Sequence, residues 1–161
     1  MSALGSYEVL ERARFEHCMD LARNVRTETT GKWIFKTSTV SGLAEFHHAW
    51  DAAALLRVDF DHSGYALGTY IDVQLAMNEA SLFDDESELA HVLSRVFTAG
   101  FVFDTPATLP ELSDEKISTY CRTEYADTRP EMIEALKAAH SFYQSGLAEV
   151  TPENLVVFVI R

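Results

Sequence analysis

The 161-residue chain has few cysteines, glycines and basic residues, and each shortage excludes a class of protein. The two cysteines, Cys18 and Cys121, lie too far apart for a Cys-x-x-Cys zinc or redox site. The seven glycines stand singly, which excludes a glycine-rich phosphate loop. No Gly-x-Ser-x-Gly sequence marks a hydrolase nucleophile. Cys18 falls among apolar residues of a predicted helix, where a free cysteine packs as a small hydrophobic side chain.

Long apolar runs are also missing. No segment approaches the ~20 apolar residues that a helix needs to cross a bilayer. The first twenty residues carry acids where a signal peptide has a basic region followed by an apolar one. A hydrophobic content of 47% with 24% charged residues is typical of an ordinary globular protein. We therefore expect one cytoplasmic domain over residues 1–161, without a membrane segment.

Basic residues are scarce and unevenly distributed. The chain holds 13 Lys and Arg against 25 Asp and Glu, for a net charge of −12. Residues 1–36 are nearly balanced, so residues 37–161 carry the whole excess of acid. Such a field repels nucleic-acid phosphates and anionic lipids and attracts basic proteins. We expect a basic protein partner and no direct contact with nucleic acid or membrane, although solubility alone also favours an acidic surface.

Hydrophobic periodicity predicts alternating helices and strands. Helices are expected at 4–26, 41–53, 84–97, around 117–121 and from Pro130 to Gly146, and strands at 32–40, 55–60, 65–77, 100–104 and 154–160. The segments 55–60 and 65–77 are expected to form a β-hairpin. Residues 65–77 also fit a helix, because Leu67, Tyr70 and Ile71 would share one of its faces.

These elements predict an α+β fold, with a mainly antiparallel sheet of about five strands and helices packed largely on one face. The apolar run at 154–160 is expected to lie centrally in the sheet, because it does not alternate with polar residues. The predicted core consists of Phe46, Trp50, Val58, Ile71, Leu89, Val92, Leu93, Val96, Leu136, Val157 and Val159.

The stretch DFDHSG, residues 59–64, resembles the start of a calcium-binding loop. Asp59, Asp61, Ser63 and Gly64 match positions 1, 3, 5 and 6 of that loop. Position 12 requires a bidentate Glu and is Tyr70 instead. Asp, Ser and Gly are equally suited to a tight turn, so we expect a turn at residues 61–64 without a bound cation.

The stretch EFHHAWD, residues 45–51, is the alternative site. On a helix, Asp51 follows His47 by four residues and His48 by three, so an imidazole and the carboxylate could share a metal ion. A hydrolytic centre would need at least one further ligand and a group that activates water. A small metal-dependent hydrolase built around His47, His48 and Asp51 is therefore the second hypothesis.

The first hypothesis is a non-catalytic binding protein that needs no cofactor. Its acidic surface would dock on a basic partner, as an inhibitor, an immunity protein, a nucleic-acid mimic or a chaperone does. The expected contact residues are Asp84, Asp85, Glu86, Glu88, Asp104, Glu111, Asp114 and Glu115. Acids in a first helical turn also favour the helix dipole, which is a competing explanation for the first four.

Overall fold

The computed structural model describes residues 3–31, 36–77, 82–126 and 129–161. It confirms the α+β class. Strands are β1 (Gly5–Glu11), β2 (Arg26–Thr30), β3 (Thr37–Ser41), β4 (Ala54–Asp59), β5 (Ala99–Phe103) and β6 (Asn154–Ile160). Helices are α1 (Arg12–Asn24), α2 (Leu43–Ala53), α3 (Gly64–Met77), α4 (Glu88–Leu93), α5 (Asp114–Tyr125) and α6 (Pro130–Leu147). None of the described helices is long and apolar enough to cross a membrane.

The main sheet has four strands in the order β4-β1-β6-β5, and every neighbouring pair is antiparallel. The apolar run at 154–160 forms β6 and lies between β1 and β5, as expected of a central strand. Phe158 of β6 is paired in register with Tyr7 of β1 on one side and with Phe101 of β5 on the other. The centre of the sheet is thus built from residues at opposite ends of the chain.

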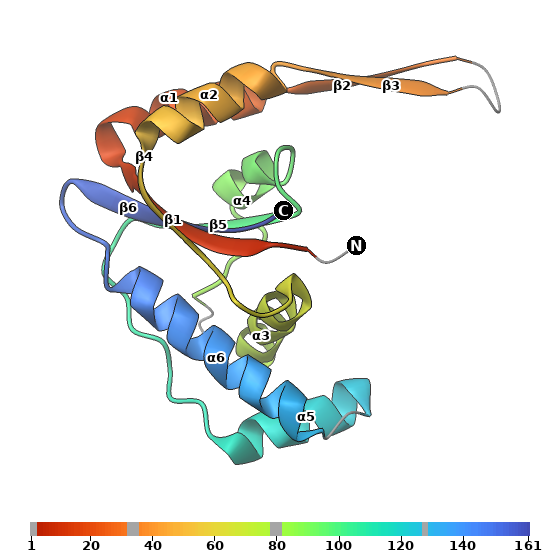
Figure 1. Ribbon diagram of the computed structural model, residues 1–161, viewed down its shortest axis with the longest axis vertical. Coiled ribbons are helices and arrows are strands. Elements are labelled where there is room, and N and C mark those ends of the chain that lie inside the picture. The colour runs from red at the N-terminus through yellow and green to blue at the C-terminus, as the bar shows by residue number, and fades with distance from the viewer. Residues whose placement is uncertain (1–2, 32–35, 78–81, 127–128) are drawn as a thin grey trace.

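Helices cover both faces of this sheet rather than largely one. Figure 1 shows α1, α2 and α4 on one face and α3, α5 and α6 on the other. Alternate residues of β6 supply the two cores: Val156 and Phe158 face the α3–α6 side, and Val157 and Val159 face the α1–α2 side. Because both faces are buried, β6 has no polar face, which explains its continuous apolar sequence.

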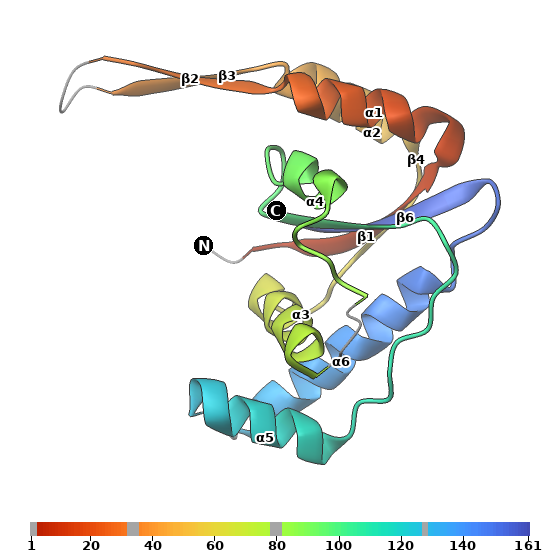
Figure 2. The same cartoon turned by 180° about the vertical axis from the view of Figure 1, so that it is seen from behind.

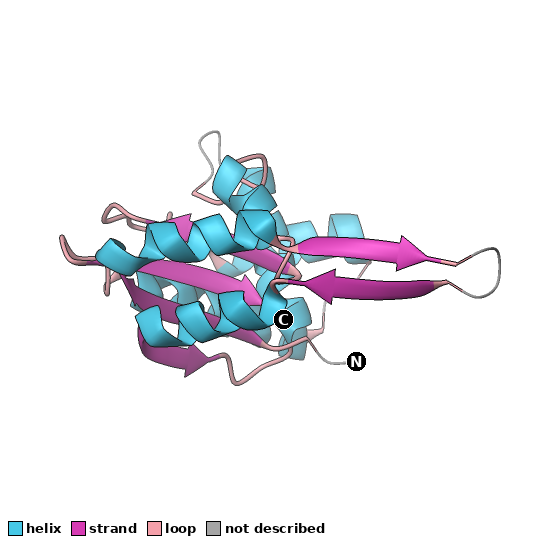
Figure 3. Cartoon of the chain, turned by 90° about the horizontal axis from the view of Figure 1, so that it is seen from above, coloured by secondary structure: helices cyan, strands magenta, loops and turns pink. Residues whose placement is uncertain are grey.

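The strands β2 and β3 form a separate two-stranded hairpin between α1 and α2. Figures 2 and 3 show that it projects away from the body of the molecule. All ten of its strand residues are exposed. The predicted strand at 32–40 is confirmed for β3, while residues 32–35 lie outside the described residues.

The predicted helix at 4–26 is wrong in its first third. Residues 5–11 form the central strand β1, and the helix α1 begins only at Arg12. The reason is that two polar residues of this segment, Ser6 and Glu8, are buried in the strand. Polar residues at such positions are typical of the exposed face of a helix.

The predicted β-hairpin at 55–77 is also wrong. Residues 54–59 are the strand β4, but 64–77 are the helix α3, so Asp61–Ser63 connect a strand to a helix. The helix buries residues nearly all around its axis, including Leu67, Tyr70 and Val73. Because α3 is buried on most sides, its sequence shows no clear helical period. The apolar residues at every second position therefore do not distinguish a strand from a helix in this segment.

Most of the predicted core is confirmed. Eight of the eleven residues are buried, among them Trp50, Leu93 and Leu136 with no exposed surface. The other three, Val58, Leu89 and Val96, are half-buried and pack against the two cores. Cys18 is buried at 1% exposure, as expected of a core cysteine.

Candidate binding surfaces

The acids at 84–86 lie before α4 rather than inside it. The predicted helix at 84–97 is confirmed only for Glu88–Leu93. Its N-cap is Ser87, whose Oγ accepts a hydrogen bond from the backbone N–H of Ala90 at 3.0 Å. The helix terminus is therefore capped without Asp84, Asp85 or Glu86. Of the four clustered acids, only Glu88 stands in the first helical turn.

Two of the predicted contact residues line one small hollow between α4 and β5. Asp84 and Asp104 are part of its lining, and the volume of the hollow is about 150 Å³. The other lining residues are Leu82, Ser87, Leu89, Phe101 and Val102. The hollow therefore has an apolar lining with carboxylates at two positions.

Asp85 lines two neighbouring hollows. One, of about 250 Å³, lies between α3 and β5 and also includes Asp72 and Leu75. The other, of about 130 Å³, includes His91 and Ser94. Phe101 lines all three hollows, so they lie along the edge strand β5. We call the exposed side chains Asp84, Asp85, Glu86 and Asp104 the acidic rim.

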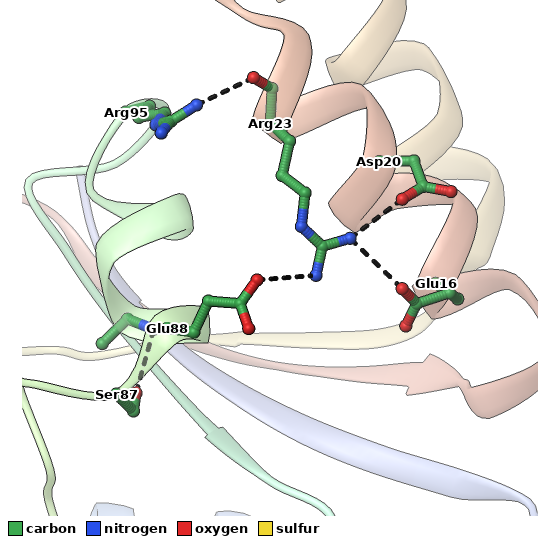
Figure 4. A network of polar contacts seen from close by, with 7 residues as sticks. Glu16, Asp20, Arg23, Ser87, Glu88 and Arg95 are labelled. Carbon is green, nitrogen blue, oxygen red and sulfur yellow. Dashed lines mark hydrogen bonds and ion pairs between the residues drawn. The ribbon is translucent and has the colours of Figure 1, made fainter.

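Glu88 is already paired within the fold (Figure 4). Its carboxylate lies 3.5 Å from Nη2 of Arg23, which also binds Asp20 at 2.8 Å and Glu16 at 3.2 Å. The hydrogen bond to Glu16 is the main cause that raises the pKa of Arg23 above its ordinary value. Arg95 donates to the backbone carbonyl of Arg23 at 2.8 Å. This network connects α1 to α4, so Glu88 has an ion pair within the fold, whereas no ion pair joins the acidic rim to another described residue.

The remaining predicted contact residues lie elsewhere. Asp114 and Glu115 open α5, on the opposite face of the sheet from α4 (Figure 1). Asp114 pairs with Lys137 of α6 at 2.9 Å, and this contact is the main cause that raises the pKa of Lys137. Glu115 lines a separate hollow between α3 and α5, and Glu111 is exposed just before α5. The expected contact surface thus divides between the two faces.

The metal hypothesis gains no supporting geometry. Within the described ranges, no three His, Cys, Asp or Glu side chains are placed to hold a metal ion. His47 is half-buried, with its ring 5.4 Å from that of Phe46 and 6.4 Å from that of Phe97. His48 and Asp51 are exposed.

A buried carboxylate that the sequence analysis missed lies in the middle of β1. Glu8 is only 2% exposed. It accepts hydrogen bonds from the indole N–H of Trp50 and, at 2.5 Å, from Nη2 of Arg161. Ser6 Oγ donates to it at 3.3 Å, and Nε of Arg57 lies 3.9 Å away. These contacts tie β1 to α2, β4 and β6 and satisfy the buried charge.

Arg161 also lines a hollow in which the charged side chains are basic rather than acidic. This hollow, of about 440 Å³, lies between α2, the α4–β5 connection and the end of β6. It is lined by His47, Arg95, Val96, Phe97, Thr98 and Arg161. We call it the basic hollow. No single stretch of sequence contains these residues, so no local pattern predicted it.

Comparison with known proteins gives no relatives for this chain: no family model, no curated protein and no solved structure matches it.

Proposed function

We propose that this chain is a non-catalytic binding protein that docks a basic protein partner on its acidic rim. The proposal covers several classes of protein, namely inhibitor, immunity protein, nucleic-acid mimic and chaperone. These share the same physical requirement, a set of carboxylates placed to receive lysine and arginine side chains.

The observation that carries the proposal is that folding does not account for the rim. Ser87 already caps α4, so Asp85 and Glu86 are not needed for the helix terminus. Neither carboxylate forms an ion pair with a described residue, and among the described donors the Asp84 carboxylate accepts only from the Glu86 backbone N–H, at 3.0 Å. Three adjacent acids repel one another, and the single local hydrogen bond of Asp84 involves only one of them. A cationic partner would relieve this repulsion.

The shape of the neighbouring hollow supports a basic side chain as its occupant. Long cationic side chains lay their methylene groups on apolar surface and keep the charged head at its edge. Leu89 and Val102 offer such a surface, and Asp84 and Asp104 offer carboxylates beside it. An arginine head can bind a carboxylate through two parallel hydrogen bonds, which gives direction as well as attraction.

The charge of the whole chain would assist the encounter. Residues 37–161 carry the whole acidic excess, and a field of one sign raises the association rate of an oppositely charged partner. Exposed charges act over about 8 Å at physiological ionic strength, so binding should weaken steeply as salt is added.

The test is titration of a fluorescent octa-arginine peptide over a series of salt concentrations. The variant carries Asp84→Asn, Asp85→Asn and Glu86→Gln together. Each lost exposed contact should cost about 0.2–1 kcal/mol of binding free energy. The variant should bind more weakly and with a shallower salt dependence, while its melting temperature stays close to that of the original chain.

The matched control carries Glu111→Gln, Glu115→Gln and Glu124→Gln, three exposed acids in or just before α5. It changes the net charge by the same amount on the other face of the sheet. Its binding should stay near that of the original chain. Equal weakening in both variants would mean that total charge, not the acidic rim, attracts the peptide, and the proposal would be wrong.

A further inference from the structure

The basic hollow differs in charge from the rest of this acidic protein. Among its lining residues are two arginines, a histidine and a threonine, and no Asp or Glu. The chain as a whole has about twice as many acids as basic residues. A concave surface of a few hundred Å³ with a few convergent polar groups is typical of a small-molecule site.

The guanidinium of Arg161 is held in place before any ligand binds. Its Nη2 donates to Glu8 at 2.5 Å and its Nη1 to Ser6 Oγ at 3.2 Å. The Cζ atom of this guanidinium lies 5.0 Å from the centre of the Phe97 ring, in a cation–π contact. These contacts use two of the five N–H groups of the guanidinium, so others remain for a ligand. The buried Glu8 thus acts as a positioning residue for Arg161.

Arg95 supplies a charge that no carboxylate of the described residues neutralises. Its Nη1 donates to the backbone carbonyl of Arg23, and no ion pair joins it to a described acid. The backbone of Arg95 is fixed in the turn after α4, where its N–H donates to the backbone carbonyl of Val92 at 3.1 Å. The next residues are fixed as well, because Thr98 donates its N–H to the carbonyl of Ile160 at 2.7 Å. The donors of the hollow therefore stand on rigid backbone.

From this arrangement we infer that the basic hollow binds a phosphorylated small molecule. Guanidinium groups bind phosphate and carboxylate oxygens through paired hydrogen bonds. Here two guanidinium groups, an imidazole and a hydroxyl from three separate segments line one hollow, so several polar groups are available to a single ligand. A phosphate monoester offers three terminal acceptor oxygens and up to two negative charges, whereas a carboxylate offers two oxygens and one charge, so phosphate makes fuller use of these groups. The volume of about 440 Å³ leaves room for an organic group beside Val96.

The experiment measures binding of phenyl phosphate, inorganic phosphate and benzoate to the full chain by isothermal titration calorimetry. Phenyl phosphate should bind saturably, with a dissociation constant below about 1 mM. Benzoate should bind more weakly than phenyl phosphate. No saturable binding of either phosphate, or tighter binding of benzoate, would overturn the inference.

Variants locate the site. Arg95→Gln removes one charge-assisted hydrogen bond and should weaken phenyl phosphate binding about 10- to 100-fold. The matched control, Arg122→Gln on α5, removes an exposed arginine outside the hollow and should leave binding unchanged. Arg161→Lys keeps the charge beside Glu8 but loses the guanidinium fork, and should also weaken binding. If Arg122→Gln weakens binding as much as Arg95→Gln, the anion binds elsewhere.

Discussion

Replacing Glu8 by Gln should destabilise the fold strongly, although the change removes only one charge. The carboxylate is 2% exposed and accepts from Trp50, Arg161 and Ser6. A Gln side chain offers one oxygen to these donors and turns its own N–H groups toward the others. Arg161 would then keep its charge without a partner beneath it.

The magnitude follows from the burial of the two partners. Removing one member of a buried ion pair costs about 3–5 kcal/mol of unfolding free energy. Arg161 is 26% exposed, so water can compensate part of the loss, and we expect a value near the lower end, about 3 kcal/mol. Arg57 approaches Glu8 only to 3.9 Å and is 43% exposed. Arg57→Gln should therefore cost less than about 1 kcal/mol and serves as the control.

Urea unfolding monitored by tryptophan fluorescence gives both values. Trp50 is one of two tryptophans and touches Glu8, so its emission also reports on the network. A double-mutant cycle with Arg161→Gln separates the interaction from the cost of each single change. If Glu8→Gln costs less than the Arg57→Gln control, the buried network does not hold the sheet to α2 and the reasoning is refuted.

Two further predictions follow. Gly146→Ala in α6 should destabilise the fold by about 1–3 kcal/mol, because the new Cβ would lie 2.5 Å from Cζ of Phe158. At Gly68 in α3 a new Cβ meets no atom within 4 Å, so Gly68→Ala should stabilise the fold by about 1 kcal/mol. Equal effects of the two changes in urea melts would contradict the close packing of α6 on β6. The Nδ1 atom of His140 lies 2.5 Å from the hydroxyl oxygen of Tyr70, and burial lowers the pKa of His140. The folded chain therefore protonates this imidazole less readily than the unfolded chain does. Stability should therefore fall as the pH drops below about 6.5, and His140→Gln should reduce that loss; an unchanged pH dependence would exclude His140 as its source.

The parts of the fold that could be predicted from the sequence are those with an unambiguous hydrophobic pattern. The strand β6 is apolar from residue 155 to residue 160 because both of its faces are buried, and α2 shows Phe46, Trp50 and Ala53 at helical spacing. Pro130 stands at the first turn of α6, where its missing N–H costs nothing.

The errors have a common physical cause, which is the burial of residues outside the usual pattern. Glu8 is an acid in a central strand, and its partners Trp50 and Arg161 are distant in the sequence, so the local sequence does not indicate that its charge is satisfied. Helix α3 buries Gln74 and Thr69 along with its apolar residues, so it lacks a polar face that would reveal its period.

The candidate site was predictable only in part. The count of acids identified Asp84, Asp85 and Glu86, but the role of Ser87 as N-cap and the separation of Asp114 from the acidic rim depend on tertiary structure. The basic hollow could not be predicted, because the fold brings His47, Arg95 and Arg161 together from three distant segments.

The most direct test of the docking proposal is to locate the bound basic peptide by nuclear magnetic resonance. The ¹⁵N-labelled chain is titrated with octa-arginine, and backbone amide shifts are followed at low and at physiological salt. The account predicts that the largest shifts fall at residues 82–89 and 101–104, around the acidic rim, and that they shrink together as salt is raised. Shifts centred on α5, or spread evenly over all exposed acids, would contradict it.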